Sequence, residues 1–515
     1  MSTPSARIHP RRRRLLTLPA ALLLLSFAVA VPSTSAASGL VSWSDPFTQA
    51  TCAASNTTNH AANVEPDSFS NTSTIVAAFQ VGRIFDGGAC AIGFSTSSDN
   101  GATWTNGLLP GITKRVGGGS FDRATDAAVA YDDRHSVWLI STLPLNEAGG
   151  VKGVGVLTSR STNGGLTWGN PVAIPTTAGM ISPDKNWIVC DNTATSPFYG
   201  NCYTEWDDNG AGNQMEMSTS TDGGLTWSVA ATNGAGIIGG QPVVRPDGTV
   251  IVPTANANET AIGAFNSTNG GASWSAVTTI ATIKHHAVAG GLREGPLPSA
   301  EIDGNGTVYV SWADSRFRKG GKTNDIVITH STNATGTNWS AVSRVPIDLT
   351  SSGIDHFIPG LAVNKATSGA TAQLGLTYYF YPSRSTQLSV GFISSGNAGS
   401  TWTTSSTILS GMTSTWAANT SQGRMVGDYI STSYGSDNLA HGIFGAANTP
   451  STGAATSCTT SAPDNCDAPI DTFTPGLALG NASSAADPVL FSGAGGVGAA
   501  SLWNIVDNNG IKHRD

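Results

Sequence analysis

Charged side chains are scarce in this sequence. Asp, Glu, Lys and Arg together make up 12% of the 515 residues, whereas Gly alone occupies 61 positions. Such a composition fits few long helices and suits many short strands that are joined by polar turns. The length is sufficient for one large repeat domain with further segments at its ends.

Long apolar runs are also lacking, except near the N-terminus. The run from Leu15 to Val31 follows four arginines, Arg11 to Arg14, and small residues come after it. This order predicts a signal peptide at residues 1–36, with cleavage after Ala30 or Ala36. The arginines resemble a twin-arginine signal, and a general secretory signal explains them equally well. We therefore expect a secreted protein without a membrane span.

Positive charge is in short supply as well. Removal of residues 1–36 takes away five of the 26 basic residues and none of the 34 acidic ones, which leaves a net charge of −13. An acidic exported protein is not expected to bind nucleic acid or an anionic membrane through its overall field. We expect neither partner, and we expect a monomer.

Cysteine is limited to six residues, an even number that favours disulfides in an exported chain. Proximity in the sequence suggests the pairs Cys190–Cys202, Cys458–Cys466 and Cys52–Cys90. Their spacing fits no usual zinc site, and no third ligand accompanies His285-His286 or His356 at a suitable spacing. We therefore predict no metal and no cofactor.

One eight-residue motif recurs along the chain. Residues 97–104 and 220–227 both read Ser-x-Asp-x-Gly-x-Thr-Trp. Near copies with Asn at the third place lie at 161–168, 267–274 and 395–402, and the copy at 331–339 has one inserted residue. The first serines are 64, 59, 47, 64 and 64 residues apart, which indicates an array of similar β-units.

Every element of this motif serves a turn. Ser and Asp or Asn accept hydrogen bonds from turn amides, and Gly adopts positive φ without steric cost. Thr-Trp then begins the next strand, and the indole buries a large apolar area. We therefore assign the motif a structural role rather than a catalytic one.

In each unit of four predicted strands, the motif turn joins the third strand to the fourth. The clearest unit has strands at 297–302, 307–312 and 325–330 and a fourth from Asn338. Six such units and a hairpin at 424–433 and 441–446 are predicted between residues 64 and 447. Segments 41–47 and 472–479 are the two candidates to pair with this hairpin and close a ring.

These units predict an all-β propeller of four-stranded antiparallel blades, with seven blades favoured over six. The propeller is expected at residues 64–447. It follows an N-terminal segment, residues 37–63, and precedes a loop-rich C-terminal tail, residues 448–515.

The repeated motif resembles the Asp-box of the sialidase superfamily, and the resemblance covers roughly residues 64–402. The strings Asp184–Trp187, Trp312–Arg316 and Gly427–Tyr429 resemble those of exported bacterial sialidase-like glycosyl hydrolases. The resemblance implies a propeller that takes a carbohydrate as substrate or ligand.

The order of strands in a meander places each connection on one of two faces. If the motif turns lie on one face, the connections before the first strands and after the second strands lie on the other. The polar residues before the first strands are Glu65, Asp122, Arg123, Asp126, Asp184, Lys185, Gln241, Arg293, Glu294, Asp355, His356, Arg424 and Asp428. Those after the second strands are Arg83, Asp86, Asn146, Glu147, Glu205, Asp207, Asn256, Asp314, Arg316, Tyr381 and Arg384.

Arginine is concentrated on this second face. Six of the 13 arginines beyond residue 36 are assigned to it: Arg83, Arg123, Arg293, Arg316, Arg384 and Arg424. Arginine forks suit bidentate binding of a carboxylate, and nearby carboxylates are candidate general acids or bases. Such residues also pair with each other at strand ends, as Asp314 and Arg316 are placed to do.

The sialidase resemblance implies three arginines for the substrate carboxylate, a Tyr nucleophile activated by Glu, and an Asp acid/base. By position, the binders are Arg293, Arg384 and Arg424, and the acid/base is Asp126 or Asp122. The nucleophile is Tyr378 or Tyr429, with Glu205 or Glu294 as its partner. The familiar Phe-Arg-Ile-Pro motif is absent, and the nearest string, Val81–Phe85, follows a second strand instead of beginning a first one.

Three functions remain open at this stage. The first is an exo-acting glycosidase on an anionic or decorated glycan. The second is a polysaccharide lyase, for which His356 beside Asp355 is a candidate base. The third is a propeller that binds a glycan or a protein without catalysis.

Overall fold

The computed structural model describes residues 1–2, 39–43, 45–382, 385, 387–450, 457–459, 461, 463–478, 505–506 and 512–513. The predicted signal peptide lies outside the described residues except for Met1 and Ser2, so the fold below concerns residues from Gly39 onward. Among the described residues, no helix has the length and apolar character that a membrane crossing requires.

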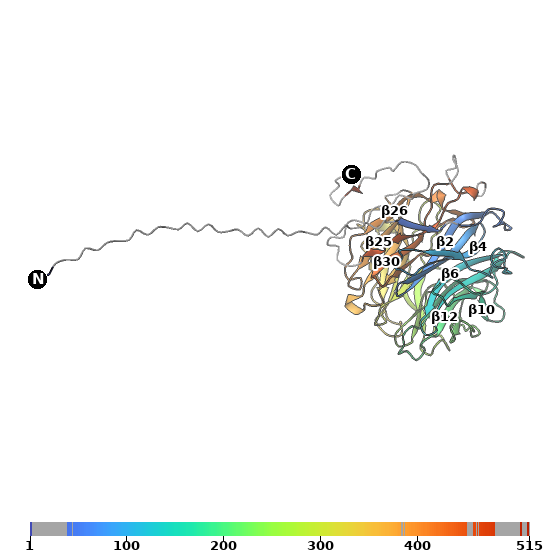
Figure 1. The fold of residues 1–515 in the computed structure, drawn as a ribbon, viewed down its shortest axis with the longest axis horizontal. Coiled ribbons are helices and arrows are strands. Elements are labelled where there is room, and N and C mark those ends of the chain that lie inside the picture. The colour runs from blue at the N-terminus through green and yellow to red at the C-terminus, as the bar shows by residue number, and fades with distance from the viewer. Residues whose placement is uncertain are drawn as a thin grey trace. The chain divides into compact units, whose positions relative to one another are not determined.

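Antiparallel sheets, together with a few single-turn 3-10 helices, make up the described fold (Figure 1). The first meander is β2 (Thr58–Asn71), β3 (Thr74–Ile84), β4 (Ala89–Ser97) and β5 (Thr105–Leu108). The second is β6 (Arg123–Asp132), β7 (Val137–Asn146), β9 (Leu157–Ser161) and β10 (Val172–Ala173), with β8 (Lys152–Gly153) beside β7. The third is β11 (Pro183–Cys190), β12 (Cys202–Asp208) and β13 (Gln214–Ser220).

Three further sheets follow in chain order. The fourth contains β14 (Ile237–Ile238), β15 (Val243–Val244), β16 (Val250–Asn256), β17 (Ala261–Ser267) and β18 (Thr278–Thr282). The fifth contains β19 (Ser299–Ile302), β20 (Val308–Asp314), β21 (Asp325–His330) and β22 (Ser343–Arg344). The sixth contains β23 (Asp355–Val363), β24 (Leu374–Tyr381), β25 (Gln387–Ser395) and β26 (Ser406–Thr413).

The last sheet combines both ends of the fold. Its strand order is β29 (Ser431–Tyr434), β30 (Leu439–Gly445), β31 (Ile470–Thr474) and β1 (Gly39–Trp43). Both segments that the sequence offers as closing strands are therefore present in one sheet. A short hairpin, β27 (Ala418–Thr420) with β28 (Gly423–Met425), precedes it.

The first strands of successive sheets contact one another in a cycle. Strand β2 contacts β6, then β11, β15, β19, β23 and β29 follow in turn, and β29 contacts β2 again. In Figure 1 the sheet of β30 lies beside the sheet of β2, in agreement with the contacts between these two strands.

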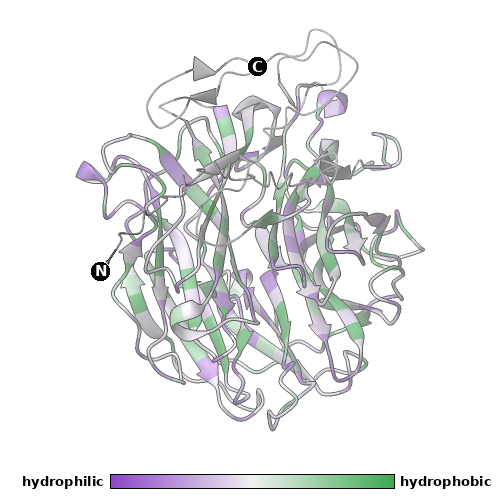
Figure 2. Cartoon of the chain, turned by 60° about the vertical axis from the view of Figure 1, so that its left-hand side comes forward, coloured by the Kyte–Doolittle hydropathy of each residue, from purple (hydrophilic) through white to green (hydrophobic). Residues whose placement is uncertain are grey.

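The core lies between neighbouring sheets, because both faces of a strand are covered. On β3, Val76 and Ala78 pack toward the second meander, whereas the alternating residues Ala77 and Phe79 pack toward Ile443 of the last sheet. This is the period-2 alternation of a strand with two buried faces. Hydrophobic residues accordingly follow the strands, and hydrophilic ones gather in the connections (Figure 2).

The repeated motifs form hydrogen-bonded turns. In the copy at 220–227, Asp222 accepts bonds from the backbone of Thr226 at 2.9 Å and from its hydroxyl at 2.6 Å, and Ser220 accepts from Gly224 at 2.9 Å. Gly224 has a φ of 77°. The fourth strands begin later than the motif suggests: β18 starts at Thr278, four residues after Trp274.

The disulfide prediction is confirmed. Cys52–Cys90, Cys190–Cys202 and Cys458–Cys466 are the pairs, so all six cysteines are oxidised. The first disulfide links Cys52 to Cys90 in β4, and the second joins β11 to β12.

The motif turns provide a stability prediction. We expect Asp222→Ala to lower the free energy of unfolding by about 1–3 kcal/mol, because several donors lose their acceptor. Asp222→Asn is the matched control, since Asn occupies this place in four other copies, and we expect it to retain most of the stability. Urea denaturation of both variants checks this, and an equal loss in the two would contradict the role assigned to the side-chain oxygen.

Candidate functional site

Four first strands carry a bulge that holds a left-handed residue, which is Ile358 in β23 and a charged residue in each of the other three. The pairing register shifts next to Glu65 in β2, Asp126 in β6 and Lys185 in β11. These residues have φ values of 56°, 49° and 50°. A left-handed non-Gly residue costs about 1–3 kcal/mol, and bulges redirect side chains near functional sites. Here the bulges bring one charged side chain from each of three sheets together.

Lys185 is the centre of the resulting ionic cluster. Its Nζ lies 2.5 Å from Asp428 Oδ2, 3.2 Å from Glu65 Oε1 and 3.7 Å from Asp126 Oδ1. Arg293 also pairs with Asp428. The side chain of Lys185 is only 6% exposed, and its three carboxylate partners are 7% exposed or less. We call Glu65, Asp126, Lys185, Arg293 and Asp428 the Lys185 cluster.

The carboxyl groups of this cluster differ in acidity. Burial raises the pKa of Glu65 to about 7, although Lys185 acts in the opposite direction. Burial also raises the pKa of Asp126, and Asp184, whose side chain lies within hydrogen-bonding reach of it, raises that pKa further. For Asp428, burial is outweighed by Arg293 and Lys185, which hold its pKa below the usual range. The cluster therefore combines two carboxyl groups that burial makes less acidic with one that neighbouring cations make more acidic.

A cavity of about 250 Å³ opens beside this cluster. We call it the cluster cavity. Glu65, Asp126, Lys185 and Arg293 line it, and so do residues of the β3–β4, β7–β8 and β12–β13 connections. Arg83 lines it as well: burial and the nearby Arg293 lower the pKa of Arg83 to about 10. Two guanidinium groups at one cavity are the arrangement that binds a carboxylate or sulfate.

The other predicted arginines have partners elsewhere. Arg123 is buried between Asp86 at 2.6 Å and Glu147 at 2.7 Å. Arg316 forms a bidentate pair with Asp314, as its sequence position allows. The side chain of Arg424 donates to the carbonyls of Ala417 and Cys458. Arg384 lies outside the described residues.

Four of the six predicted catalytic residues lie away from the cluster cavity. Asp122 pairs with Lys114 at 2.6 Å, and Glu294 accepts a hydrogen bond from His285 at 2.7 Å. Glu205 is fully buried, and Tyr378 lies in an apolar core.

Asp126 and Tyr429 are the two that reach the cluster. Asp126 lines the cavity, whereas Tyr429 is buried beneath it, with its hydroxyl 3.4 Å from the carbonyl of Ala127. Burial, followed by Glu65, raises the pKa of Tyr429. Because this hydroxyl does not line the cavity, the geometry favours carboxyl groups over a tyrosine for the chemistry.

Glu65, Asp184, Lys185 and Asp428 are site residues to which the sequence assigned a face but no role. Their partners come from different sheets, and Lys185 is 120 residues from Glu65 and 243 from Asp428. The available signal was positional, because Glu65, Asp126 and Lys185 stand at equivalent places near the starts of three first strands.

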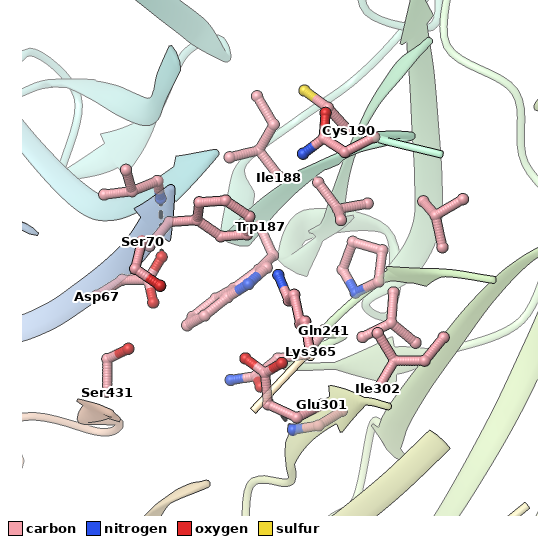
Figure 3. A pocket seen from close by; sticks show the side chains of 18 of the residues that line it. Asp67, Ser70, Trp187, Ile188, Cys190, Gln241, Glu301, Ile302, Lys365 and Ser431 are labelled. Carbon is pink, nitrogen blue, oxygen red and sulfur yellow. Dashed lines mark hydrogen bonds between the residues drawn. The ribbon is translucent and has the colours of Figure 1, made fainter. Parts of the chain in front are cut away.

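A second cavity, of about 350 Å³, lies on the side of the turns that join first to second strands (Figure 3). Pro246, Asp303 and Gly304 of these turns line it, together with Trp187, and we call it the turn-side cavity. Gln241 also lines this cavity, so its assignment to the other face was wrong.

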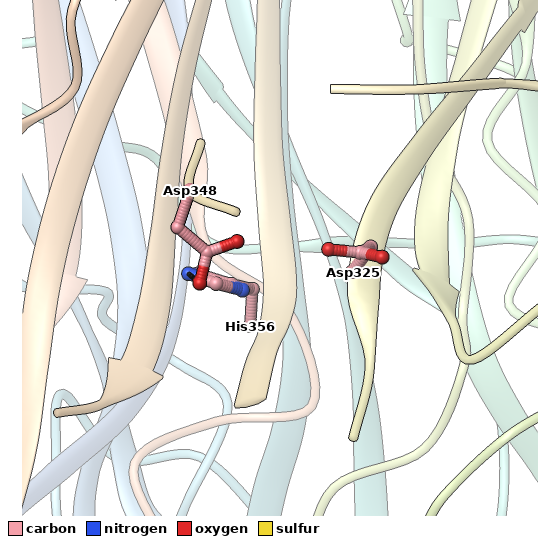
Figure 4. Close-up of side chains that lie close together, drawn as sticks. All are labelled: Asp325, Asp348 and His356. Atoms are coloured by element: carbon pink, nitrogen blue, oxygen red, sulfur yellow. Dashed lines mark ion pairs between the residues drawn. The ribbon is translucent and has the colours of Figure 1, made fainter. Parts of the chain in front are cut away.

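A group of Asp325, Asp348 and His356 has the spacing of metal ligands (Figure 4). Two guanidinium groups already bind these carboxylates, since Arg318 and Arg344 each pair with both Asp325 and Asp348 at 2.5–2.8 Å. The charges balance without a cation. Burial lowers the pKa of His356 to about 4, so a general-base role for this buried histidine has no support from the geometry.

Comparison with known proteins gives one family match. The model of a BNR repeat-like domain matches residues 147–414. No curated protein matches the chain.

Solved structures with a similar fold have low identities. A protein of unknown function from Dyadobacter fermentans is 17% identical, with a TM-score of 0.45, over 70% of this chain and all of the other. Trypanosoma rangeli sialidase in complex with sialic acid is 13% identical, with a TM-score of 0.42, over 66% of this chain and 55% of the sialidase.

An ulvan lyase from a new family of polysaccharide lyases is 10% identical, with a TM-score of 0.46, over 86% of this chain and 97% of the lyase. The chain thus spans about half the length of the trypanosomal sialidase and nearly all of the lyase. Identities of 10–17% with TM-scores of 0.42–0.46 do not discriminate between activities.

Glu65 makes stability depend on pH. Its pKa rises from 4.5 to about 7 on folding, so the folded protein holds this proton more tightly than the unfolded chain does. The stabilisation is complete below pH 4.5 and is lost as pH rises through about 7. We expect the wild type to lose about 3 kcal/mol more than Glu65→Gln between these limits. Urea denaturation at several pH values measures the difference, and parallel curves would contradict it.

The ion pairs of Arg318 with Asp325 and Asp348 provide a further stability prediction. Arg318→Met leaves Asp325 and Asp348 undercompensated, so we expect a loss of about 3–5 kcal/mol. Arg134→Met, at an exposed arginine, should change stability little. We also expect EDTA to leave the Tm unchanged, and a fall in Tm on chelation would show that a metal ion contributes to folding.

Proposed function

Because the chain belongs to the BNR repeat-like domain family, of the sialidase-like superfamily, we propose that it is a glycoside hydrolase that acts on an anionic glycan at the cluster cavity. The observation that supports this most directly is the composition of that cavity. Arg83 and Arg293 line it together with Glu65 and Asp126, two carboxyl groups whose pKa values are raised. Anion binding and proton donation thus coincide in one place.

The two arginines bind the acidic group of the sugar. Arg293 is 22% exposed and is anchored by Asp428, so its remaining N–H groups are available to a carboxylate or sulfate. Arg83 is held by Gly88, whose carbonyl accepts from its Nη1 at 2.7 Å. Fixed donors lose little conformational freedom on binding, which favours affinity.

Asp126 donates the proton to the leaving-group oxygen. Asp184 beside it raises the pKa of Asp126 and so favours this role. Glu65, with a pKa of about 7, is the second carboxyl group that faces the substrate and stabilises positive charge on the sugar when it is ionised. Water adds to the anomeric carbon as the bond to the leaving group breaks, and it returns a proton to Asp126, so this route needs no tyrosine nucleophile.

We also propose that the fold is a closed propeller of seven blades, which is supported by the cycle of contacts among β2, β6, β11, β15, β19, β23 and β29. We propose that the protein is exported as a monomer by means of residues 1–36, and the three disulfides favour an oxidising compartment. Its expected ligand is a carbohydrate, without nucleic acid or membrane as a partner.

Purified protein tested on fluorogenic sialosides and on a uronate-containing polysaccharide separates the possible functions. Release of the fluorophore or of reducing sugar supports hydrolysis. Ultraviolet absorbance from unsaturated products would identify a lyase instead, and an inactive protein that still binds the anionic glycan would be a binding propeller.

On an active substrate, Arg293→Met should lower kcat/KM by about 10- to 100-fold, because a charge-assisted hydrogen bond is lost. Arg293→Lys retains the charge but not the fork, so its effect should be smaller. Arg134→Met, outside the cavity, is the control.

Asp184→Asn should move the alkaline limb of the pH profile to lower pH, because it removes a charge that raises the pKa of Asp126. An unmoved limb would contradict the role of this carboxyl pair.

A further inference from the structure

The turn-side cavity is separate from the cluster cavity and has a different chemistry. It opens between exposed turn residues such as Asn192 and Gly304. A neighbouring cavity of about 230 Å³ shares six lining residues with it, among them Glu301 and Lys365, so these two side chains face both cavities. The Lys185 cluster and Tyr429 line neither of these two cavities.

The polar groups of the turn-side cavity are held in fixed orientations. Gln241 accepts the N–H of Ala300 at 2.9 Å through Oε1, which leaves its amide NH₂ as a donor. The ammonium group of Lys365 lies 4.0 Å from the ring centroid of Phe69. Glu301 and Lys365 influence each other's ionisation, and no ion pair joins them. The side chain of Lys365 is exposed, as is expected of a group that faces a water-filled space.

Trp187 provides the flat apolar wall of the turn-side cavity. Its indole packs edge-to-face against Tyr429, with the ring centroids 5.1 Å apart and the planes at 78°. This contact fixes the ring from behind, and the indole lines the cavity in front (Figure 3). An aromatic face with negative quadrupole attracts the partially positive C–H groups of an aliphatic ring.

Charge distinguishes the two mouths. The cluster cavity is lined by four basic residues, Arg83, Lys152, Lys185 and Arg293, and by four acidic ones, Glu65, Asp86, Asp126 and Asp184. The turn-side cavity has Lys365 as its only basic lining residue, with Asp67, Glu301 and Asp303 as the acidic ones. The turn-side cavity therefore lacks the pair of guanidinium groups that the cluster cavity offers to an anionic sugar, and its acidic residues outnumber its basic one.

We propose that the turn-side cavity binds an uncharged sugar residue, with its ring against Trp187 and its hydroxyls on Gln241, Glu301 and Lys365. A hydroxyl both donates and accepts, so it matches an amide NH₂, a carboxylate and an ammonium group side by side. A volume of about 350 Å³ accommodates a unit of one or two sugars. The site binds without cleaving, and it attaches the protein to neutral stretches of a glycan independently of the cluster cavity.

Calorimetric titration of the full-length mature protein tests this inference. The probes are pentasaccharides of cellulose, arabinan, galactan and laminarin, with a trigalacturonate as the anionic comparison. We expect at least one neutral probe to bind with a Kd below about 1 mM. Glu301→Ala and Lys365→Ala should each raise that Kd at least ~5-fold, because each removes a hydrogen-bonding group.

Lys322→Ala is the matched control for Lys365→Ala, since Lys322 is exposed and lines neither cavity. Its Kd should equal that of the wild type. Circular dichroism confirms that each variant is folded, and Ser70→Trp, which fills the cavity from β2, provides a further route to lost binding.

The inference is overturned if no neutral probe saturates, if both alanine variants bind as the wild type does, or if trigalacturonate competes with the neutral sugar. Loss of hydrolysis has no bearing on these outcomes, because the titration measures binding alone. A failure of the function proposed for the cluster cavity is thus distinguishable from a failure here.

Discussion

The ammonium group of Lys185 is the interaction on which the arrangement of this fold depends. It contacts Asp428 of the segment that leads into the last sheet, Glu65 of the first and Asp126 of the second, while Lys185 itself belongs to the third. Removing one partner of a buried ion group costs several kcal/mol, because the remaining charges stay without compensation. One cation therefore connects the first three meanders with the segment that leads into the last sheet.

Acidic groups outnumber basic groups around Lys185. Four acidic groups, Glu65, Asp126, Asp184 and Asp428, surround Lys185 and Arg293. Burial raises the pKa of Glu65 and of Asp126, to which nearby acidic groups add, whereas Arg293 and Lys185 lower the pKa of Asp428. Structural stability and proton donation thus derive from the same imbalance.

The sequence predicted the fold better than the site, and the reason is the range of the interactions. The hydrogen-bonding partners in a motif turn lie within eight residues, as in Ser220–Trp227, so the local sequence is sufficient to predict them. Disulfides between nearby cysteines were predictable for the same reason. Arg316 was also foreseeable as a partner of Asp314, two residues away.

The site residues depend on pairings that no local pattern contains. Glu294 has a suitable position near a first strand, but its carboxylate forms a hydrogen bond with His285. Arg123 similarly lies between Asp86 and Glu147. Gln241 lines the turn-side cavity instead of the cluster cavity. Only the bulges at Glu65, Asp126 and Lys185 select which charged residues converge, and a bulge is a feature of strand pairing rather than of composition.

The pairing of β1 with β31 has a consequence for how the chain assembles. Gly39 pairs with Thr474. β1, the first strand of the fold to be synthesised, therefore cannot pair until β31, one of the last, has been synthesised. Contacts of such sequence separation form slowly, because a long loop must close first. Until β1 pairs, β31 presents an unpaired edge, and without β31 the edge of β30 is unpaired, so truncation from either end leaves a strand edge available for pairing between molecules. Soluble folding is therefore expected to require both ends of the described fold at once.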